Sequence, residues 1–231
     1  MVFRRLKQGI RHRRLRANGI SVDCQLTTVA YGARSGSWTI YPEAIEPGSV
    51  VYSFGVGNNI KWDLELIANH RVELHAFDPT PRSVNWIDKQ SLPAEFHFHP
   101  MGLSNRDGAI NFYVPVKEYK INYSSYKSKS PDGETVSCPV KRFGTLISDL
   151  GHSKVDIVKM DIEGGEVDVL PDMLSGNFNI GQLLVEFHYN FPNIAFEEFA
   201  DLIAMLRDEG FRIYHISERA YEFSFIHQSV L

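Results

Sequence analysis

The chain has 231 residues, of which 43% are hydrophobic and 23% are charged, a composition typical of a folded globular protein. This excludes disordered and collagen-like chains, and no apolar run approaches the ~20 residues that a membrane helix needs. The two cysteines, Cys24 and Cys138, are too isolated to form a CxxC ligand pair or a disulfide framework. With a start that lacks the apolar core of a signal peptide, they favour a cytoplasmic location.

The charge of −4 is unevenly distributed along the chain. Seven of the 24 basic residues lie within residues 1–16, which contain no acid, so the remaining 17 are set against 28 acidic residues. We interpret residues 1–47 as a basic N-terminal segment that leads into a domain at 48–231. The helical spacing of Phe3, Leu6 and Ile10 is compatible with contact to an anionic membrane surface or an acidic partner. A solvated or self-docked helix is the better-supported alternative, and the acidic body argues against a nucleic-acid partner.

From residue 49 onward, strand and helix patterns alternate. β-Branched and aromatic runs predict strands at 49–54, 72–77, 94–99, 155–160 and 183–187. Helical spacing of apolar residues predicts helices at 60–68, 82–89, 166–174 and 196–207. Two final strands, 211–216 and 221–227, are close enough to pair antiparallel at the edge of the sheet. The pattern predicts a doubly wound, mostly parallel α/β sheet, with ligands at the carboxyl ends of its strands.

A glycine turn, Gly55-Val56-Gly57-Asn58, follows the first of these strands, and Asp78 ends the second. A carboxylate about 20 residues past such a turn can reach the ribose of a nucleoside cofactor. A dinucleotide fingerprint needs a small residue three positions after Gly57, where this chain has Ile60. S-adenosylmethionine is therefore favoured over NAD. An NAD-dependent oxidoreductase, or a plain tight turn with a solvated Asp78, stays as an alternative.

Charged residues also end the next two strands. If the strand pattern persists to Glu163, then Lys159, Asp161 and Glu163 share one face of the fourth strand. Glu186 and His188 end the fifth strand. Such a group can supply a general base with its orienting partners. It can also bind a divalent metal through Asp161, Glu186 and His188. A buried ion network around Lys159 is the alternative interpretation.

Residues 155–170 (VDIVKMDIEGGEVDVL), which follow Thr145-Leu146, resemble the signature of the FkbM-family methyltransferases. The upstream segments VVYSFGVG, HAFDPTP and HPMGLSNRDG fit the same family in the same order, so the resemblance covers roughly residues 48–190. It implies a class I methyltransferase (Rossmann-like) fold, with a mostly parallel seven-stranded sheet and an antiparallel C-terminal strand. It further implies that S-adenosylmethionine methylates an oxygen of a small-molecule acceptor, a sugar or another metabolite.

The resemblance also implies roles for particular residues. Gly55, Val56 and Gly57 would contact the methionine part of the cofactor, Asp78 the ribose, and Met101, Gly102 and Leu103 the adenine. Ser53 stands where many members of the family have an acid, so Asp63 or Asn58 would contact the cofactor's amino group. Asp161 would lie near the transferred methyl. Our own hypothesis is that Asp161 or His188 takes the proton of the acceptor, with Glu163 and Glu186 orienting the base or a metal, and Lys159 is a further catalytic candidate. If Ser53 marks a decayed cofactor site, the chain is instead a non-catalytic binding module.

Two further features lie between these motifs. The segment 111–141 is an insertion that we interpret as a hairpin or lid over the acceptor, and its tyrosines Tyr113, Tyr119, Tyr123 and Tyr126 suit stacking on rings. A solvated hairpin is the alternative. His97 and His99 share one face of the third strand, but without a nearby acid such a pair is more typical of packing than of metal ligation. No pattern indicates an oligomeric state.

Overall fold

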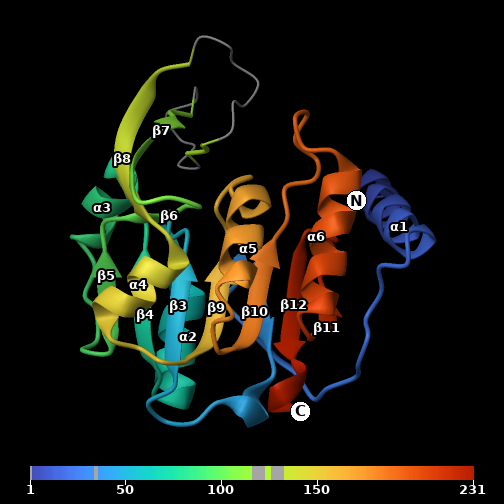
Figure 1. The fold of residues 1–231 in the computed structure, drawn as a ribbon, viewed down its shortest axis with the longest axis horizontal. Coiled ribbons are helices and arrows are strands. Elements are labelled where there is room, and N and C mark those ends of the chain that lie inside the picture. The colour runs from blue at the N-terminus through green and yellow to red at the C-terminus, as the bar shows by residue number, and fades with distance from the viewer. Residues whose placement is uncertain (1, 34–35, 116–122, 126–132) are drawn as a thin grey trace.

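The computed structural model describes residues 2–33, 36–115, 123–125 and 133–231. Within these residues, seven strands form one sheet in the spatial order β11-β12-β10-β9-β3-β4-β5 (Figure 1). The strands are β3 (Val50–Phe54), β4 (Glu73–Phe77), β5 (Phe96–His99), β9 (Val155–Met160), β10 (Ile180–Glu186), β11 (Phe211–Ile216) and β12 (Glu222–His227). All neighbouring pairs are parallel except those that β12 makes with β10 and β11.

The strand order confirms the doubly wound, class I methyltransferase sheet that was expected. From β3 the chain builds outward through β4 to β5, then returns to β9 on the other side of β3 and continues through β10. The point where the order reverses therefore lies between β3 and β9, which is where such sheets bind their ligands. The predicted antiparallel strand is present but is internal: β12 lies between β10 and β11, so the parallel strand β11 forms the edge.

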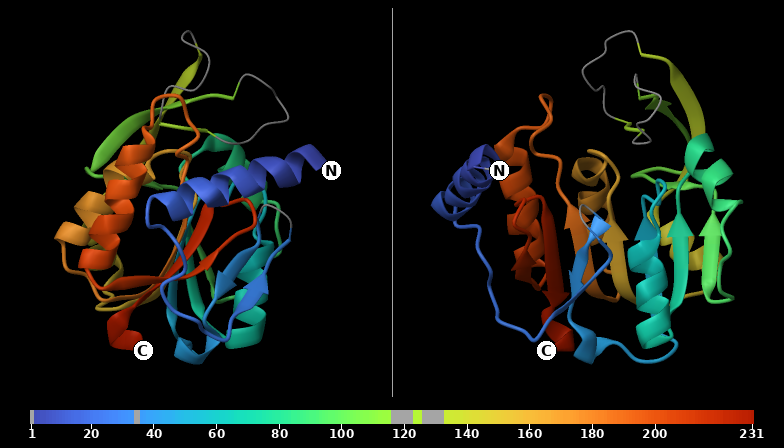
Figure 2. Two further views of the ribbon diagram at one scale, coloured as in Figure 1. Left: turned by 90° about the vertical axis from the view of Figure 1, so that its right-hand side faces the viewer. Right: turned by 180° about the vertical axis from the view of Figure 1, so that it is seen from behind.

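Helices cover both faces of the sheet (Figures 1 and 2). One face carries α4 (Phe143–Leu150), α5 (Glu166–Ser175) and α6 (Phe196–Asp208), and the other carries α2 (Lys61–His70) and α3 (Pro81–Ile87). Because β10 is covered on both sides, all of its residues are buried, and its sequence is an almost continuous apolar run. The apolar stripe of α6 is buried as its spacing predicts, through Phe196, Phe199, Leu202, Ile203 and Leu206.

The N-terminal segment packs against this domain. Helix α1 (Val2–Ala17) buries Leu15, and the Arg14 guanidinium lies 3.8 Å from the centre of the Phe196 ring. Leu6 and Ile10 stay outside the core, since they are 60% and 58% exposed. The helix is therefore self-docked near its C-terminal end, through Arg14 and Leu15. No helix in the described part of the chain is both long and apolar enough to cross a membrane.

Short elements complete the structure. An antiparallel pair, β1 (Val29–Tyr31) and β2 (Trp38–Ile40), precedes the short helix η2 (Pro42–Ala44), and η3 (Gln228–Val230) ends the described chain. The strands β6 (Gly102–Leu103), β7 (Gly108–Tyr113) and β8 (Thr135–Lys141) form a small second sheet. Since β7 and β8 pair antiparallel, the two ends of the predicted insertion form a hairpin above the carboxyl edge of the large sheet (Figure 1). Tyr119 and Tyr126 lie outside the described residues.

Candidate active site

The glycine turn after β3 is held in a conformation that requires glycine. Gly55 and Gly57 have φ values of 85° and 56°, in the left-handed region. A Cβ on Gly55 would lie 1.9 Å from the backbone oxygen of Asp161, so the turn and the end of β9 are in close contact. The turn is thereby fixed against the loop that follows β9.

Asp78, directly after β4, is hydrogen-bonded to this turn. One carboxylate oxygen accepts hydrogen bonds from the backbone N–H groups of Val56 (3.1 Å) and Gly57 (2.9 Å). The other accepts from the backbone N–H and the hydroxyl of Thr80, at 2.9 and 2.6 Å. Asp78 thus positions the turn directly in this structure, whereas its contact with a ribose stays a prediction.

A cavity of about 240 Å³ opens beside the turn, and we call it the glycine-turn cavity. Its lining joins three parts of the chain: the β1–β2 segment, the turn with the start of α2, and the end of β9. The lining residues are Gly36, Trp38, Gly55, Val56, Gly57, Asn58, Asn59, Trp62, Asp63, Lys159, Asp161 and Glu163. Most of the residues expected to contact the methionine part of the cofactor therefore lie together, and Trp38 is an addition that the sequence patterns did not indicate.

Three of the polar side chains that line the glycine-turn cavity each have a buried atom that makes no hydrogen bond to the described residues. The Oδ1 atoms of Asp63 and Asp161 and the Nε1 atom of Trp62 are buried and lack a hydrogen-bond partner among the described residues. A buried polar atom without a partner is costly, so such atoms are typical of ligand sites. The methionine part of S-adenosylmethionine carries an ammonium, a carboxylate and a sulfonium, and the orphaned carboxylate oxygens fit its positive groups.

Lys159 supplies the positive charge of this cavity. Its Nζ donates to the backbone oxygen of Gly55 (3.1 Å) and to Ser53 Oγ (3.4 Å), and it lies 5.6 Å from the centre of the Trp38 ring. Ser53 and Lys159 are direct partners in the β3–β9 register. The small Ser53 side chain thus leaves room for the Lys159 ammonium group and accepts a hydrogen bond from it. An anionic ligand group such as the cofactor's carboxylate can pair with Lys159.

A second cavity of about 300 Å³, the acid–histidine cavity, adjoins the first. Its lining comes from the ends of β9 and β10 and from the β11–β12 turn: Asp161, Glu163, Glu186, His188, Asn190, Arg219 and Tyr221. Asp161 and Glu163 line both cavities, so they form the shared wall. The predicted convergence of Asp161, Glu163, Glu186 and His188 is therefore present in the structure.

His188 is surrounded by carboxylates. Its Nδ1 lies 3.0 Å from Glu166 Oε1, and its Nε2 lies 3.4 Å from Glu163 Oε2 and 4.0 Å from Asp161 Oδ1. Burial lowers the pKa of His188, but the Glu166 hydrogen bond and the charges of Glu163 and Asp161 outweigh it and raise the pKa to about 10. The imidazole is therefore protonated at neutral pH, and a protonated ring has no lone pair for a proton or a metal ion.

Glu186 lines the same cavity as His188. Its Oε1 accepts from Arg219 at 2.9 Å, and Arg219 also pairs with Glu222 at 2.6 Å. Burial raises the pKa of Glu186 to about 8, with further upward contributions from the charges of Asp161 and Glu222. Asp161, Glu186 and His188 each offer a ligand atom within 4.8 Å of the others, which is compatible with a divalent metal once His188 loses its proton.

Glu166 contacts His188, a candidate site residue, but the sequence patterns did not single it out, although it lies within residues 155–170. Its Oε1 accepts from the His188 backbone N–H at 2.6 Å, and its Oε2 accepts from the Gly164 backbone N–H at 3.0 Å. It thereby connects the ends of β9 and β10. The insertion reaches the same loop, because the Ser124 hydroxyl donates to the Glu163 carbonyl at 2.5 Å.

Met101, Gly102 and Leu103 do not line either cavity. A Cβ on Gly102 would lie 2.9 Å from Pro79 Cγ, so this segment packs beside the end of β4. Leu103 instead lines a separate cavity together with residues of β7 and the start of α5. Their contact with an adenine stays a prediction.

The sheet order, with the glycine turn and the charged cavities at its reversal point, is that of the Rossmann-like class I methyltransferase fold. Residues 32–213 match the model of the methyltransferase FkbM domain. The chain therefore belongs to the FkbM methyltransferase domain family. This confirms the resemblance noted in the sequence.

The chain is also similar to two named proteins in sequence and to one solved structure in fold. The chain is 24% identical over 175 residues to Probable methyltransferase-like protein 24 of Homo sapiens, covering 71% of this chain and 42% of that protein. It is 22% identical over 172 residues to the 2-O-methyltransferase NoeI of Sinorhizobium fredii, covering 65% and 70%. The Methanococcus jannaschii fibrillarin pre-rRNA processing protein aligns with a TM-score of 0.48 at 10% identity, over 86% of this chain and 82% of that one. The chain spans less than half the length of the human relative.

Proposed function

We propose that this protein transfers a methyl group from S-adenosylmethionine to a hydroxyl oxygen of a small molecule such as a sugar, with Asp161 as the general base. The observation that carries the proposal is that Asp161 lies in the wall shared by the two cavities and has a buried Oδ1 without a hydrogen-bond partner among the described residues. The 2-O-methyltransferase named among the similar proteins supports an oxygen acceptor.

In this proposal the glycine-turn cavity binds the methyl donor. Asp63 accepts from its amino group, Lys159 pairs with its carboxylate, and Gly55, Val56, Gly57 and Asn58 surround its methionine part. When bound, S-adenosylmethionine supplies an electrophilic methyl group and a thioether leaving group. The residues of the chain then have to hold the acceptor oxygen in line, exclude water and accept one proton.

The acid–histidine cavity binds the acceptor. Its size, about 300 Å³, and its mixture of carboxylates with Arg219, Asn190 and Tyr221 suit a hydroxylated molecule of monosaccharide size. As the methyl–oxygen bond forms, the hydroxyl proton passes to Asp161. With its pKa raised to about 10, His188 already carries a proton at neutral pH and cannot accept another, and its positive charge instead balances Asp161 and Glu163. The methyltransferase family match disfavours an NAD-dependent oxidoreductase.

The free thiols of Cys24 and Cys138 support a reducing compartment, and we propose the cytoplasm. The alternative arrangement is a divalent metal that is held by Asp161, Glu186 and His188 and binds the acceptor oxygen. Because the protonated His188 would have to lose its proton first, metal-dependent turnover should increase with pH. Turnover that is unchanged after chelation would remove the metal from the reaction.

Asp161→Asn tests the base directly. We expect it to lower turnover by about 10²-fold, the usual scale of general-base catalysis, and to leave the affinity for S-adenosylhomocysteine within a few-fold of wild type. Turnover is followed as S-adenosylhomocysteine release with a panel of monosaccharides and phenols, and affinity by calorimetry. Asp201→Asn, on the exposed side of α6, is the matched control and should behave as wild type. Near-normal turnover of Asp161→Asn would exclude the proposed base.

A further inference from the structure

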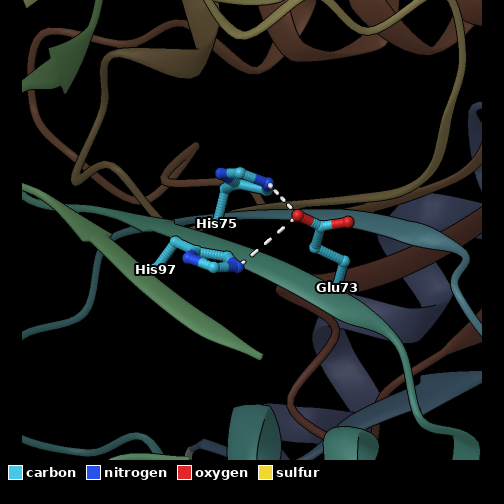
Figure 3. Close-up of side chains that lie close together, drawn as sticks. All are labelled: Glu73, His75 and His97. Atoms are coloured by element: carbon cyan, nitrogen blue, oxygen red, sulfur yellow. Dashed lines mark ion pairs between the residues drawn. The ribbon is translucent and has the colours of Figure 1, made fainter. Parts of the chain in front are cut away.

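A second group of ligating side chains lies outside both cavities, on β4 and β5 (Figure 3). Glu73 and His75 are two residues apart on β4 and so share a face, and His97 is the direct partner of His75 in the parallel β4–β5 register. From the sequence, the pair His97 and His99 is interpreted as packing rather than metal ligation. The fold places Glu73 of the neighbouring strand within 3.5 Å of His97 Nε2.

The spacing of the three ligand atoms suits a small metal ion. Glu73 Oε1 lies 3.7 Å from His75 Nε2 and 3.5 Å from His97 Nε2, and all three atoms lie within 4.8 Å of one another (Figure 3). In a tetrahedral zinc site with bonds of about 2.0–2.1 Å, ligand atoms are about 3.3–3.5 Å apart. The three side chains therefore need only small movements to share one ion.

His75 has the hydrogen-bonding pattern of a metal ligand. Its Nδ1 is 3.0 Å from His99 Nε2, while its Nε2 is buried and has no hydrogen-bond partner among the described residues. With the proton on Nδ1 and donated to His99, the lone pair of Nε2 faces Glu73 and His97. Ligating histidines are commonly oriented in this way by a second partner. His75 itself is only 6% exposed.

The electrostatic environment agrees with this geometry. Burial, followed by the neighbouring His152, His99 and His97, lowers the pKa of His75 to about 3, so the ring is neutral at neutral pH. The other two ligands reach the surface, since the side chains of Glu73 and His97 are 49% and 40% exposed. An ion can therefore enter from solvent and keep a water molecule as a fourth ligand.

We propose that Glu73, His75 and His97 bind a zinc ion through one carboxylate oxygen and two imidazole nitrogens, with water completing a tetrahedral site. Two imidazoles and one carboxylate form a ligand set that zinc commonly takes. None of the three residues lines the glycine-turn or acid–histidine cavity. The ion would join β4 to β5, the strand at the edge of the described sheet, and so stabilise that edge rather than take part in methyl transfer.

The test measures zinc binding to the full chain after removal of metal with a chelator. Wild type should bind zinc, gain thermal stability from it, and give the visible absorption of tetrahedral cobalt when Co²⁺ replaces Zn²⁺. Glu73→Gln and His97→Gln should each weaken zinc binding by about tenfold or more and lose the cobalt band. Both side chains are partly exposed, so both variants should fold, which circular dichroism checks.

Two controls separate this site from other sources of binding. Glu95→Gln removes an exposed acid just before β5 and should bind zinc as wild type does. Asp161→Asn removes a candidate metal-binding side chain from the acid–histidine cavity and should leave the cobalt band unchanged. Equal zinc affinity and stoichiometry in wild type, Glu73→Gln and His97→Gln would overturn the proposal, as would the absence of binding to wild type at micromolar zinc. Affinity for S-adenosylhomocysteine reports on the methyl-donor site separately.

Discussion

Lys159 is a buried cation whose described contacts are all uncharged groups. Its side chain is 6% exposed, and its partners are a hydroxyl, a carbonyl and the face of an indole ring. Keeping a charge in such a position is costly unless an opposite charge balances it. Asp63, Asp161 and Glu163 line the same cavity, but no acid in the described part of the chain forms a salt bridge with Lys159. A negative group of a bound ligand would therefore gain strongly from this lysine.

Replacement of this lysine should reveal which part of the donor it contacts. We expect Lys159→Met to weaken S-adenosylhomocysteine binding by about tenfold or more, since a hydrogen bond to a charged group contributes about 1.5–3 kcal/mol. Methylthioadenosine, which lacks the amino and carboxylate groups, should bind the variant as it binds wild type. Calorimetry with both ligands makes the comparison, and Lys89→Met, at an exposed position, is the control. Equal losses for the two ligands would indicate a general distortion of the cavity instead.

The elements that the sequence predicted best are those with local signals. Alternation and helical spacing located the strands of the large sheet and α2, α5 and α6 to within a few residues, and the glycine turn and the strand-end acids were found as motifs. Trp38 and Arg219 were missed because they reach the cavities from β2 and from the β11–β12 turn, through packing that has no local pattern. The protonation of His188 was missed for the same reason, since it depends on Glu166 from α5.

The contact between the glycine turn and the end of β9 is where two elements depend on each other most closely. Gly55→Ala should both strain the backbone at φ 85° and drive a Cβ into the Asp161 carbonyl, 1.9 Å away. Gly48→Ala imposes the same strain, at φ 86°, with no atom within 4 Å of the new Cβ. We expect Gly48→Ala to cost about 1–2 kcal/mol of unfolding free energy and Gly55→Ala clearly more, with loss of S-adenosylhomocysteine binding. Equal costs in urea unfolding would mean that the turn can move away from β9.

Ion pairs around His188 and Glu186 connect the acid–histidine cavity to neighbouring elements. His188 faces Asp161, Glu163 and Glu166 from β9 and α5, with Glu186 and Arg219 close by. The N-terminal helix α1 contacts Arg219, because Arg11 Nε donates a hydrogen bond to the backbone carbonyl of Arg219 at 2.7 Å. The basic α1 therefore contacts the turn whose Arg219 side chain pairs with Glu186.

The dependence of stability on pH follows from the two raised pKa values. His188 has an ordinary pKa of 6.5 and a folded pKa of about 10, so its contribution to stability is fully present below pH 6.5 and is lost as the pH rises to 10. Glu186, raised from 4.5 to about 8, acts in the same direction, because the folded state again holds the proton more tightly. One retained proton changes the free energy of unfolding by up to about 1.4 kcal/mol per pH unit. Wild type should therefore lose stability steadily between pH 7 and pH 9.

A histidine replacement isolates the His188 contribution. His188→Gln should start from a lower stability at pH 7 and show a clearly shallower loss between pH 7 and pH 9, measured by urea unfolding at each pH. His12→Gln, in α1 and outside the group around His188, should keep the wild-type slope. If His188→Gln retains the full wild-type slope, the proton is not held by His188. The imidazole is then neutral at pH 7, and it becomes available as a base for the acceptor hydroxyl in place of Asp161.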